Sequence, residues 1–212
     1  MASRSIDPVV ARRRTAARAG HTGDDEGARA LLGDPDGGVR GAALGALHRM
    51  GALMLAELLA ALVDRDPTVR RRACEVASTF GGDEGTPPDP AVARAVADLL
   101  DDDEAAVVET AAWACGERPP AAAAVVGRLA EVATTHDDAL CREAAVAALG
   151  ALGDPAGLPA VLAATHDKAT VRRRAVIALA PFEGTEVDEA LERAREDRDW
   201  QVRQAAEDLL AP

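Results

Sequence analysis

The chain has very few aromatic residues, a single lysine and no tyrosine. Its 212 residues include two Trp and two Phe, so that aromatic side chains make up 2% of the sequence, whereas 48% of the residues are hydrophobic. This composition is too poor in large side chains for the core of a β-sandwich or a β-barrel. Alanine and leucine supply most of the apolar residues instead, which favours closely stacked helices.

The sequence also lacks the features of nucleic-acid-binding, exported and membrane proteins. The formal net charge of −12 at pH 7 argues against the dense basic face that binds a nucleic-acid backbone, so we do not expect nucleic acid as a partner. No charged and then apolar leader opens the chain, and no run of about 18 apolar residues could span a membrane. We therefore expect a cytoplasmic protein that does not enter a membrane.

The three cysteines do not suggest a metal or redox site. Cys74, Cys115 and Cys141 lie far apart and form no CxxC or Cys/His pattern. Each falls in a segment expected to be helical, so we predict buried free thiols. The sequence also shows no convergent acid, base and nucleophile, and we predict no catalytic residue, metal or cofactor.

A motif of two aspartates followed by Val-Arg recurs along the chain, in the form Asp-x-Asp-x-x-Val-Arg. Its clear and looser copies cover residues 34–40, 64–70, 102–108, 136–142, 166–172 and 197–203. Successive copies are 30 to 38 residues apart. Self-similarity at this period predicts a solenoid, in which each repeat buries its apolar face against its neighbours.

Each repeat is predicted to be a pair of helices joined by the Asp-rich turn, whose aspartate caps the second helix. First helices are expected at residues 24–33, 52–63, 89–100, 120–134, 155–164 and 185–196. Second helices are expected to begin near Gly37, Pro67, Glu104, Asp138, Ala169 and Asp199. The segment that follows Asp7 resembles a second helix without a first one, capping the N-terminal end. We thus predict an all-α solenoid of about six helical hairpins.

The repeats are expected to form a single domain over residues 7–212, after a disordered tail at residues 1–6. Two repeats are longer than the others, with extra residues at 81–90 and around 117–124. We interpret the segment at 81–90 as a tolerated insertion. A functional loop is the alternative, because loops on solenoids often carry function.

The extended pattern Asp-x-Asp-x-x-Val-Arg-x-x-Ala-Ala-x-x-Leu-Gly resembles the HEAT repeat, in particular the short bacterial HEAT-like repeat of phycobilin lyases. The resemblance covers about residues 7–212. It implies a right-handed α-solenoid whose second helices line the concave face. Relatives with such repeats include scaffolds, chromophore lyases, a hydroxylase and DNA glycosylases, so the resemblance does not settle the function.

Two of these activities do not fit the sequence. The hydroxylase holds its two irons with His-Glu pairs in the second helices, and this chain contains no His-Glu pair. The glycosylases bind DNA in a basic groove with aromatic contacts, whereas this chain is acidic and almost free of aromatic residues. No residue motif of the phycobilin lyases can be carried over to it.

The second helices are predicted to place one face in the core and the opposite face in the groove. The apolar residues of the opposite face are Leu44, Trp113, Val146, Val176 and Ile177. Its charged edge consists of Arg71, Glu109, Glu143 and Arg173. The small residues that would leave room beside them are Gly116, Gly150 and Ala180. We predict that this face binds the partner with Trp113 as its anchor. Burial of these residues between adjacent second helices is the alternative.

An arginine follows the motif valine in five copies: Arg40, Arg70, Arg142, Arg172 and Arg203. Such a row can hydrogen-bond the aspartates or carbonyls of a neighbouring turn and so link the repeats. A row that binds phosphate or carboxylate is the alternative. His136 and His166 stand where other copies have an aspartate of the turn, and we expect them to be structural.

We expect a non-enzymatic scaffold or adaptor that is a monomer and binds a protein or a peptide on its concave face. The alternative is a lyase-like protein that holds a hydrophobic small molecule or chromophore in the same groove.

Overall fold

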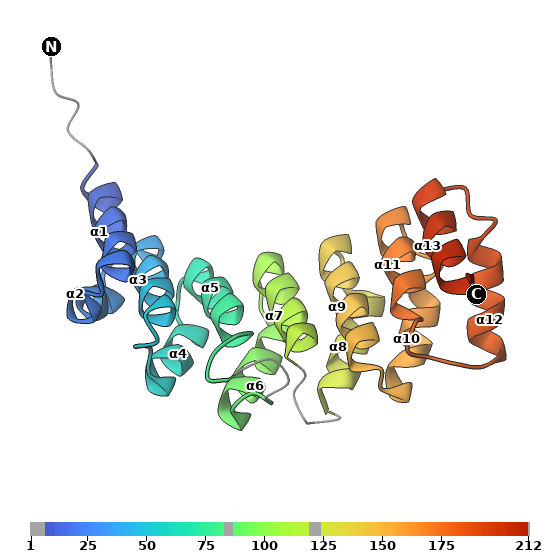
Figure 1. The fold of residues 1–212 in the computed structure, drawn as a ribbon, viewed down its shortest axis with the longest axis horizontal. Helices are drawn as coiled ribbons and strands as arrows, with labels where there is room; N and C mark the ends of the chain where they lie inside the picture. Colours follow the sequence, from blue (N-terminus) through green and yellow to red (C-terminus); the bar gives the residue numbers. More distant parts are fainter. Residues whose placement is uncertain (1–6, 83–86, 119–123, 212) are drawn as a thin grey trace, which may run out of the picture. The chain divides into compact units, whose positions relative to one another are not determined.

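The computed structural model describes residues 7–82, 87–118 and 124–211, except for the side chain of Ala124. These residues form thirteen α-helices and three short 3-10 helices, and no strand occurs among them (Figure 1). The all-α solenoid class predicted from the sequence is confirmed. None of the described helices is long and apolar enough to cross a membrane. The predicted tail at residues 1–6 and parts of both inserted segments lie outside the described residues.

First and second helices alternate along the chain, as the repeats predict. The first helices are α2 (Asp25–Ala30), α4 (Leu55–Leu62), α6 (Pro90–Asp98), α8 (Ala124–Thr135), α10 (Leu158–Ala164) and α12 (Thr185–Ala194). The second helices are α3 (Gly37–Arg49), α5 (Pro67–Ala77), α7 (Ala105–Glu117), α9 (Ala139–Leu152), α11 (Ala169–Ala178) and α13 (Trp200–Leu210). The 3-10 helices Leu31–Gly33, Leu99–Asp101 and Pro155–Gly157 extend or precede first helices.

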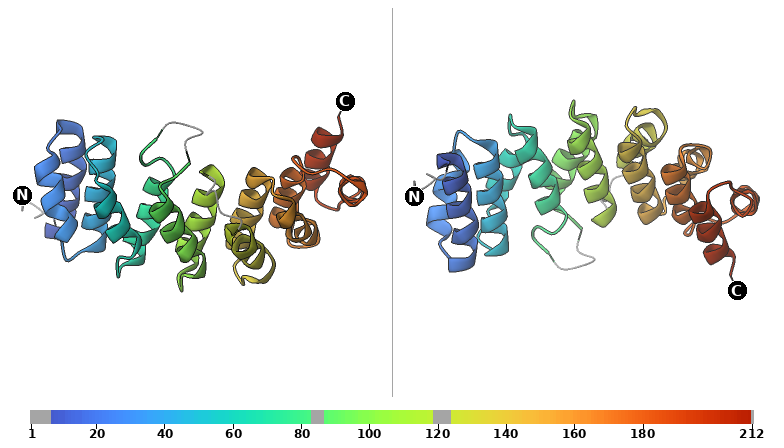
Figure 2. Two further views of the ribbon diagram at one scale, coloured as in Figure 1. Left: turned by 90° about the horizontal axis from the view of Figure 1, so that it is seen from below. Right: turned by 90° about the horizontal axis from the view of Figure 1, so that it is seen from above.

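The chain divides into two compact units, residues 1–83 and residues 84–212. Within each unit the first helices form one layer and the second helices another (Figures 1 and 2). In the first unit α3 packs on α5, and in the second unit α9 packs on both α7 and α11, while α11 packs on α13. The second helices of a unit therefore share a continuous core.

Helix α1 (Pro8–Thr22) begins the first unit and packs along α3. Asp7 caps it by accepting a hydrogen bond from the Val9 N–H, and Ala16 is fully buried. Ala16 lies at the position that Leu44 occupies in α3. Helix α1 therefore packs on α3 in the way that one second helix packs on the next.

The second aspartate of the motif caps the second helix. Its carboxylate accepts a hydrogen bond from a backbone N–H two or three residues further on, which satisfies a donor that the first turn leaves unpaired. The donor–acceptor distance is 2.9–3.0 Å at Asp36, Asp66, Asp138 and Asp199.

The first aspartate binds the arginine of the preceding repeat. The Nε and Nη2 atoms of Arg172 donate to the two carboxylate oxygens of Asp197 at 2.8 and 2.7 Å, and its Nη1 donates to the carbonyl of Asp167 at 2.8 Å. The same fork joins Arg12 to Asp34 and Arg40 to Asp64. It also joins Arg142 to Asp167, which follows the histidine at the first-aspartate position of its copy. The prediction that the arginines link repeats is confirmed for Arg40, Arg142 and Arg172, whose filled forks are not available to phosphate. Arg203 instead donates to the carbonyl of Asp197 in its own turn.

The arginine–aspartate fork is replaced at one place in the second unit, where Val108 and His136 take the two positions. Val108 takes the arginine position of α7 and is fully buried, and His136 takes the first-aspartate position of the following turn. The His136 Nδ1 accepts the Asp138 N–H at 3.0 Å, as an aspartate does in other turns. Both charges are absent together, which avoids leaving one of them unpaired in a partly buried place.

Glycines bring the second helices of the second unit close together. A methyl group at Gly150 of α9 would lie 2.7 Å from the Cα atom of Ala178 on α11, and one at Gly116 of α7 would lie 3.0 Å from that of Ala148 on α9. These glycines were expected to leave room for a ligand. They instead let the neighbouring helix approach.

The substitution Gly150→Ala tests this close approach. It should lower the free energy of unfolding by about 1–3 kcal/mol, because the added methyl group meets backbone atoms that cannot move aside easily. Gly127→Ala on α8 is the control, since no atom lies within 4 Å of its added methyl group, and it should raise stability by up to about 1 kcal/mol. Urea denaturation measures both, and equal effects of the two changes would contradict the packing described.

The Arg172–Asp197 link predicts a specific dependence of stability on pH. The hydrogen bonds from Arg172 hold the pKa of Asp197 below its usual value. A carboxylate whose pKa is lower in the folded chain than in the unfolded chain stabilises the fold at pH values above the unfolded pKa. This stabilisation is lost as the pH falls through the folded pKa. Asp197→Asn should therefore cost roughly 1–3 kcal/mol at pH 7, and less as the pH falls below about 4.

Urea denaturation of wild type and Asp197→Asn at pH 7 and pH 3 measures the difference. The exposed turn residue Asp103, changed to Asn, serves as the control and should show little effect at either pH. A cost for Asp197→Asn that is the same at both pH values would contradict the role given to the ionised carboxylate.

Candidate binding surface on the second helices

Three of the residues predicted to line the groove are in the core. Leu44 and Val146 are fully buried, and Val176 is 1% exposed. All three lie five residues after the motif valine, at a position that points toward the next repeat: Leu44 lies near Val69, and Val176 near Val202. The expectation that they face a groove is wrong, because successive second helices pack against each other along this row.

The remaining predicted residues lie two or six positions after the motif valine. These positions form a strip on each second helix, which we call the outer strip. Its side chains are exposed or half-buried, except at the buried glycines of α3. In the first unit its residues are Gly41, Gly45, Arg71 and Glu75. In the second unit they are Glu109, Trp113, Glu143, Ala147, Arg173, Ile177, Gln204 and Asp208. Trp113 is 42% exposed and Ile177 is 38% exposed, and Glu109 and Glu143 are half-buried.

The furrow between the outer strips of α3 and α5 is occupied by an arginine. Arg72 lies over Gly41 and Gly45, and a methyl group on either glycine would approach its side chain. Arg71 and Arg72 both donate to Glu75, so each of these two guanidinium groups has a carboxylate partner within the first unit.

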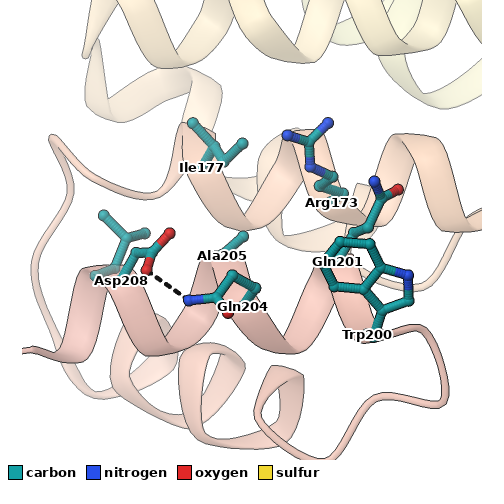
Figure 3. A pocket seen from close by; sticks show the side chains of 8 residues that line it. Arg173, Ile177, Trp200, Gln201, Gln204, Ala205 and Asp208 are labelled. Carbon is teal, nitrogen blue, oxygen red and sulfur yellow. Dashed lines mark hydrogen bonds between the residues drawn. The ribbon is translucent and has the colours of Figure 1, made fainter.

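Between α11 and α13 the corresponding furrow is open (Figure 3). Ala205 occupies the position that Arg72 has on α5, and its short side chain leaves a cavity of about 310 Å³. On α11 the same position is held by Arg174, whose Nη2 reaches Glu143 on α9 at 3.5 Å. The lining residues are Arg173, Ile177, Trp200, Gln201, Gln204, Ala205, Asp208 and Leu209. We call this cavity the α11–α13 furrow.

The two ends of the furrow differ in charge. Trp200 and Arg173 lie toward one end, and Ile177 and Asp208 toward the other (Figure 3). The Gln204 Nε2 donates to the Asp208 carboxylate at 2.8 Å. The Arg173 side chain makes no hydrogen bond or ion pair with any residue that the structure describes, so its guanidinium is available to a ligand.

Trp200, the first residue of α13, is the large apolar residue that sequence reasoning missed. It is 64% exposed and follows the cap Asp199. The corresponding residues of the other second helices are Gly37, Pro67, Ala105, Ala139 and Ala169. The exposure of Trp200 could have been predicted from the sequence, because the equivalent position of the other second helices holds a small residue or proline.

The three thiols are buried, and the imidazoles of His48 and His136 make hydrogen bonds within the chain. Burial raises the pKa of Cys115 to about 12 and that of Cys141 to about 11, so both thiols stay protonated near neutral pH. Cys74 is buried as well, so the predicted burial of the three cysteines is confirmed. The His48 Nε2 lies 3.0 Å from the Thr79 hydroxyl. Within the described ranges, no three His, Cys, Asp or Glu residues are grouped to hold a metal ion.

The family comparison accounts for the repeated motif. The family model for HEAT repeats matches residues 25–116, 54–150, 93–180 and 126–211, which together cover most of the sequence. The chain is a HEAT-repeat protein. Its Asp-x-Asp-x-x-Val-Arg motif supplies, in order, the acceptor for the preceding repeat's arginine, the helix cap, a core valine and the arginine of the next link. The sequence matches none of the curated proteins with which it was compared.

Solved structures of repeat proteins share the fold of this HEAT-repeat protein. The protein YibA of Escherichia coli has a TM-score of 0.67 and 16% identity, covering 99% of this chain and 77% of its own. An engineered protein has a TM-score of 0.62 and 18% identity, covering 88% and 95%. A designed armadillo repeat protein in complex with the peptide (KR)4 has a TM-score of 0.59 and 16% identity, covering 96% and 98%. At these identities the likeness shows the fold alone.

Side-chain truncations distinguish the buried row that contains Leu44 from the exposed residues of α7 and α13. Leu44→Ala should lower the free energy of unfolding by about 2–5 kcal/mol, because it opens a cavity in the core. Trp113→Ala and Trp200→Ala should each cost less than about 1 kcal/mol, since water already reaches these side chains. Chemical denaturation followed by circular dichroism compares the three. A cost for Trp113→Ala close to that for Leu44→Ala would assign Trp113 to the core.

Proposed function

We propose that this HEAT-repeat protein is a non-enzymatic scaffold that binds a protein or peptide on the outer strip of its second unit. The observation that carries the proposal is the exposure of Trp113, Ile177 and Trp200 on the second-helix layer of one unit. Large apolar residues that remain exposed often mark interaction sites, and tryptophan is prominent among residues that dominate binding energy.

The dimensions suit an extended segment of a partner. Adjacent packed helices lie roughly 10 Å apart, so the path from Trp113 on α7 across α9 and α11 to Trp200 on α13 is on the order of 30 Å. An extended chain advances about 3.3 Å per residue, and about nine residues would cover this path. A designed armadillo repeat protein of similar fold forms a complex with a peptide, which supports a peptide as the occupant.

The charges of the outer strip are proposed to set specificity. Glu109 near Trp113 and Arg173 near Ile177 carry opposite signs, whereas Glu143 is engaged by Arg174. A partner segment with a cationic side chain near the first tryptophan and an anionic group near the second would therefore match the surface in one direction only.

Selection of random 12-residue peptides displayed on phage against the immobilised protein tests the proposal. Selected peptides should bind Trp113→Ala and Ala205→Arg at least tenfold more weakly than wild type. The first change removes an anchor, and the second fills the α11–α13 furrow as Arg72 fills the one in the first unit. Val63→Ala is the control, because Val63 is 76% exposed but lies at the end of α4 in the first unit.

Selected peptides that bind all four proteins equally would contradict the proposed surface. If no peptide is selected and a small molecule accompanies the purified protein, detected by its absorbance or by native mass spectrometry, the scaffold function gives way to the lyase-like alternative, in which the same surface holds a hydrophobic ligand.

A further inference from the structure

Arg173 differs from the arginines on either side of it in sequence. The Arg172 guanidinium is held by the Asp197 carboxylate, and that of Arg174 reaches Glu143. Arg173 is exposed, lines the α11–α13 furrow and donates to none of the described residues. An unpaired guanidinium beside an apolar cavity is suited to a carboxylate, which it can bind through two parallel hydrogen bonds.

The furrow is short. Arg173 and Ile177 are four residues apart on one helix, so their Cβ atoms are roughly 6 Å apart. A ligand that contacts both must carry an anionic group and a large apolar group at about this separation. The C-terminal residue of a peptide chain satisfies the requirement, because its α-carboxylate and its side chain are attached to the same Cα atom.

The volume and the charges of the furrow agree with such a ligand. About 310 Å³ accommodates one large side chain with its backbone, but not a long segment of chain. The carboxylate of Asp208 would repel an anion at the Ile177 end, which directs a carboxylate to the end with Arg173 and Trp200. Gln201 lines the furrow there and carries an amide that can pair with the last peptide group of the ligand.

We propose that the α11–α13 furrow binds the C-terminal residue of a partner chain. The free α-carboxylate pairs with Arg173, and a large apolar side chain such as leucine lies between Ile177 and Trp200. The proposal rests on the scaffold function proposed above and specifies which part of the partner occupies this end of the outer strip.

Three acetylated peptides test it: Gly-Ser-Gly-Ser-Leu with a free C-terminus, the same peptide with a C-terminal amide, and Gly-Ser-Gly-Ser-Ser with a free C-terminus. Each is titrated into the full-length protein, and the indole N–H signals of Trp113 and Trp200 are followed by NMR after assignment with Trp113→Phe. The free Leu peptide should shift the Trp200 signal and bind about tenfold more tightly than the amide or the Ser peptide.

Arg173→Gln should remove the preference for the free acid over the amide and leave the affinity for the amide unchanged. Arg71→Gln is the matched control, because Arg71 has the equivalent position in the first unit, and the preference should persist in it. Circular dichroism establishes that both variants remain folded.

Equal binding of acid and amide to wild type, or an unchanged preference in Arg173→Gln, would overturn the inference. It would also be overturned if none of the three peptides shifts the Trp200 signal at millimolar concentration. In that case peptides selected by display that remain sensitive to Ala205→Arg would show that the scaffold function stands without C-terminal recognition. Absence of any selected peptide would instead contradict the scaffold function.

Discussion

The arginine fork between repeats is the interaction on which the rest of the structure depends. Each complete link, such as Arg172 to Asp197, joins a second helix to the turn that precedes the next one. The same turn carries the aspartate that caps the next helix, so one short segment sets both the register between repeats and the start of the helix. The side chains at these links are largely shielded from water, which makes the pairing more effective than an exposed surface ion pair.

This linkage, together with close helix packing, determines which residues a partner could reach. The glycines of α7 and α9 bring successive second helices of the second unit into near contact, and the row that contains Val146 and Val176 is buried as a result. Each second helix is left with only the outer strip. The two furrows described differ at one equivalent position: Arg72 lies over Gly41 and Gly45 in the first unit, whereas Ala205 lines the open α11–α13 furrow.

The helix pairs, the caps and the arginine links could be predicted because each depends on a few residues that recur in register. The burial of Leu44, Val146 and Val176 could not, since the periodicity of a single helix shows two faces and does not show how close the neighbouring helices come. The furrow was missed for the same reason. It lies beside the short side chain of Ala205, and Trp200 is the first residue of α13, ahead of the helix positions that were compared between repeats. Arg173 and Ile177 were identified because they lie on the helix face opposite the core, on the part of it that the neighbouring second helices leave exposed.

The most direct test of the account is to map a bound peptide, obtained by display selection, onto the whole chain by backbone and indole NMR chemical shifts. We expect the shifted signals to lie along the outer strips of α7, α9, α11 and α13 and to include both indole N–H groups. Shifts confined to the first helices, or to the strip of α3 and α5 where Arg72 fills the furrow, would contradict it.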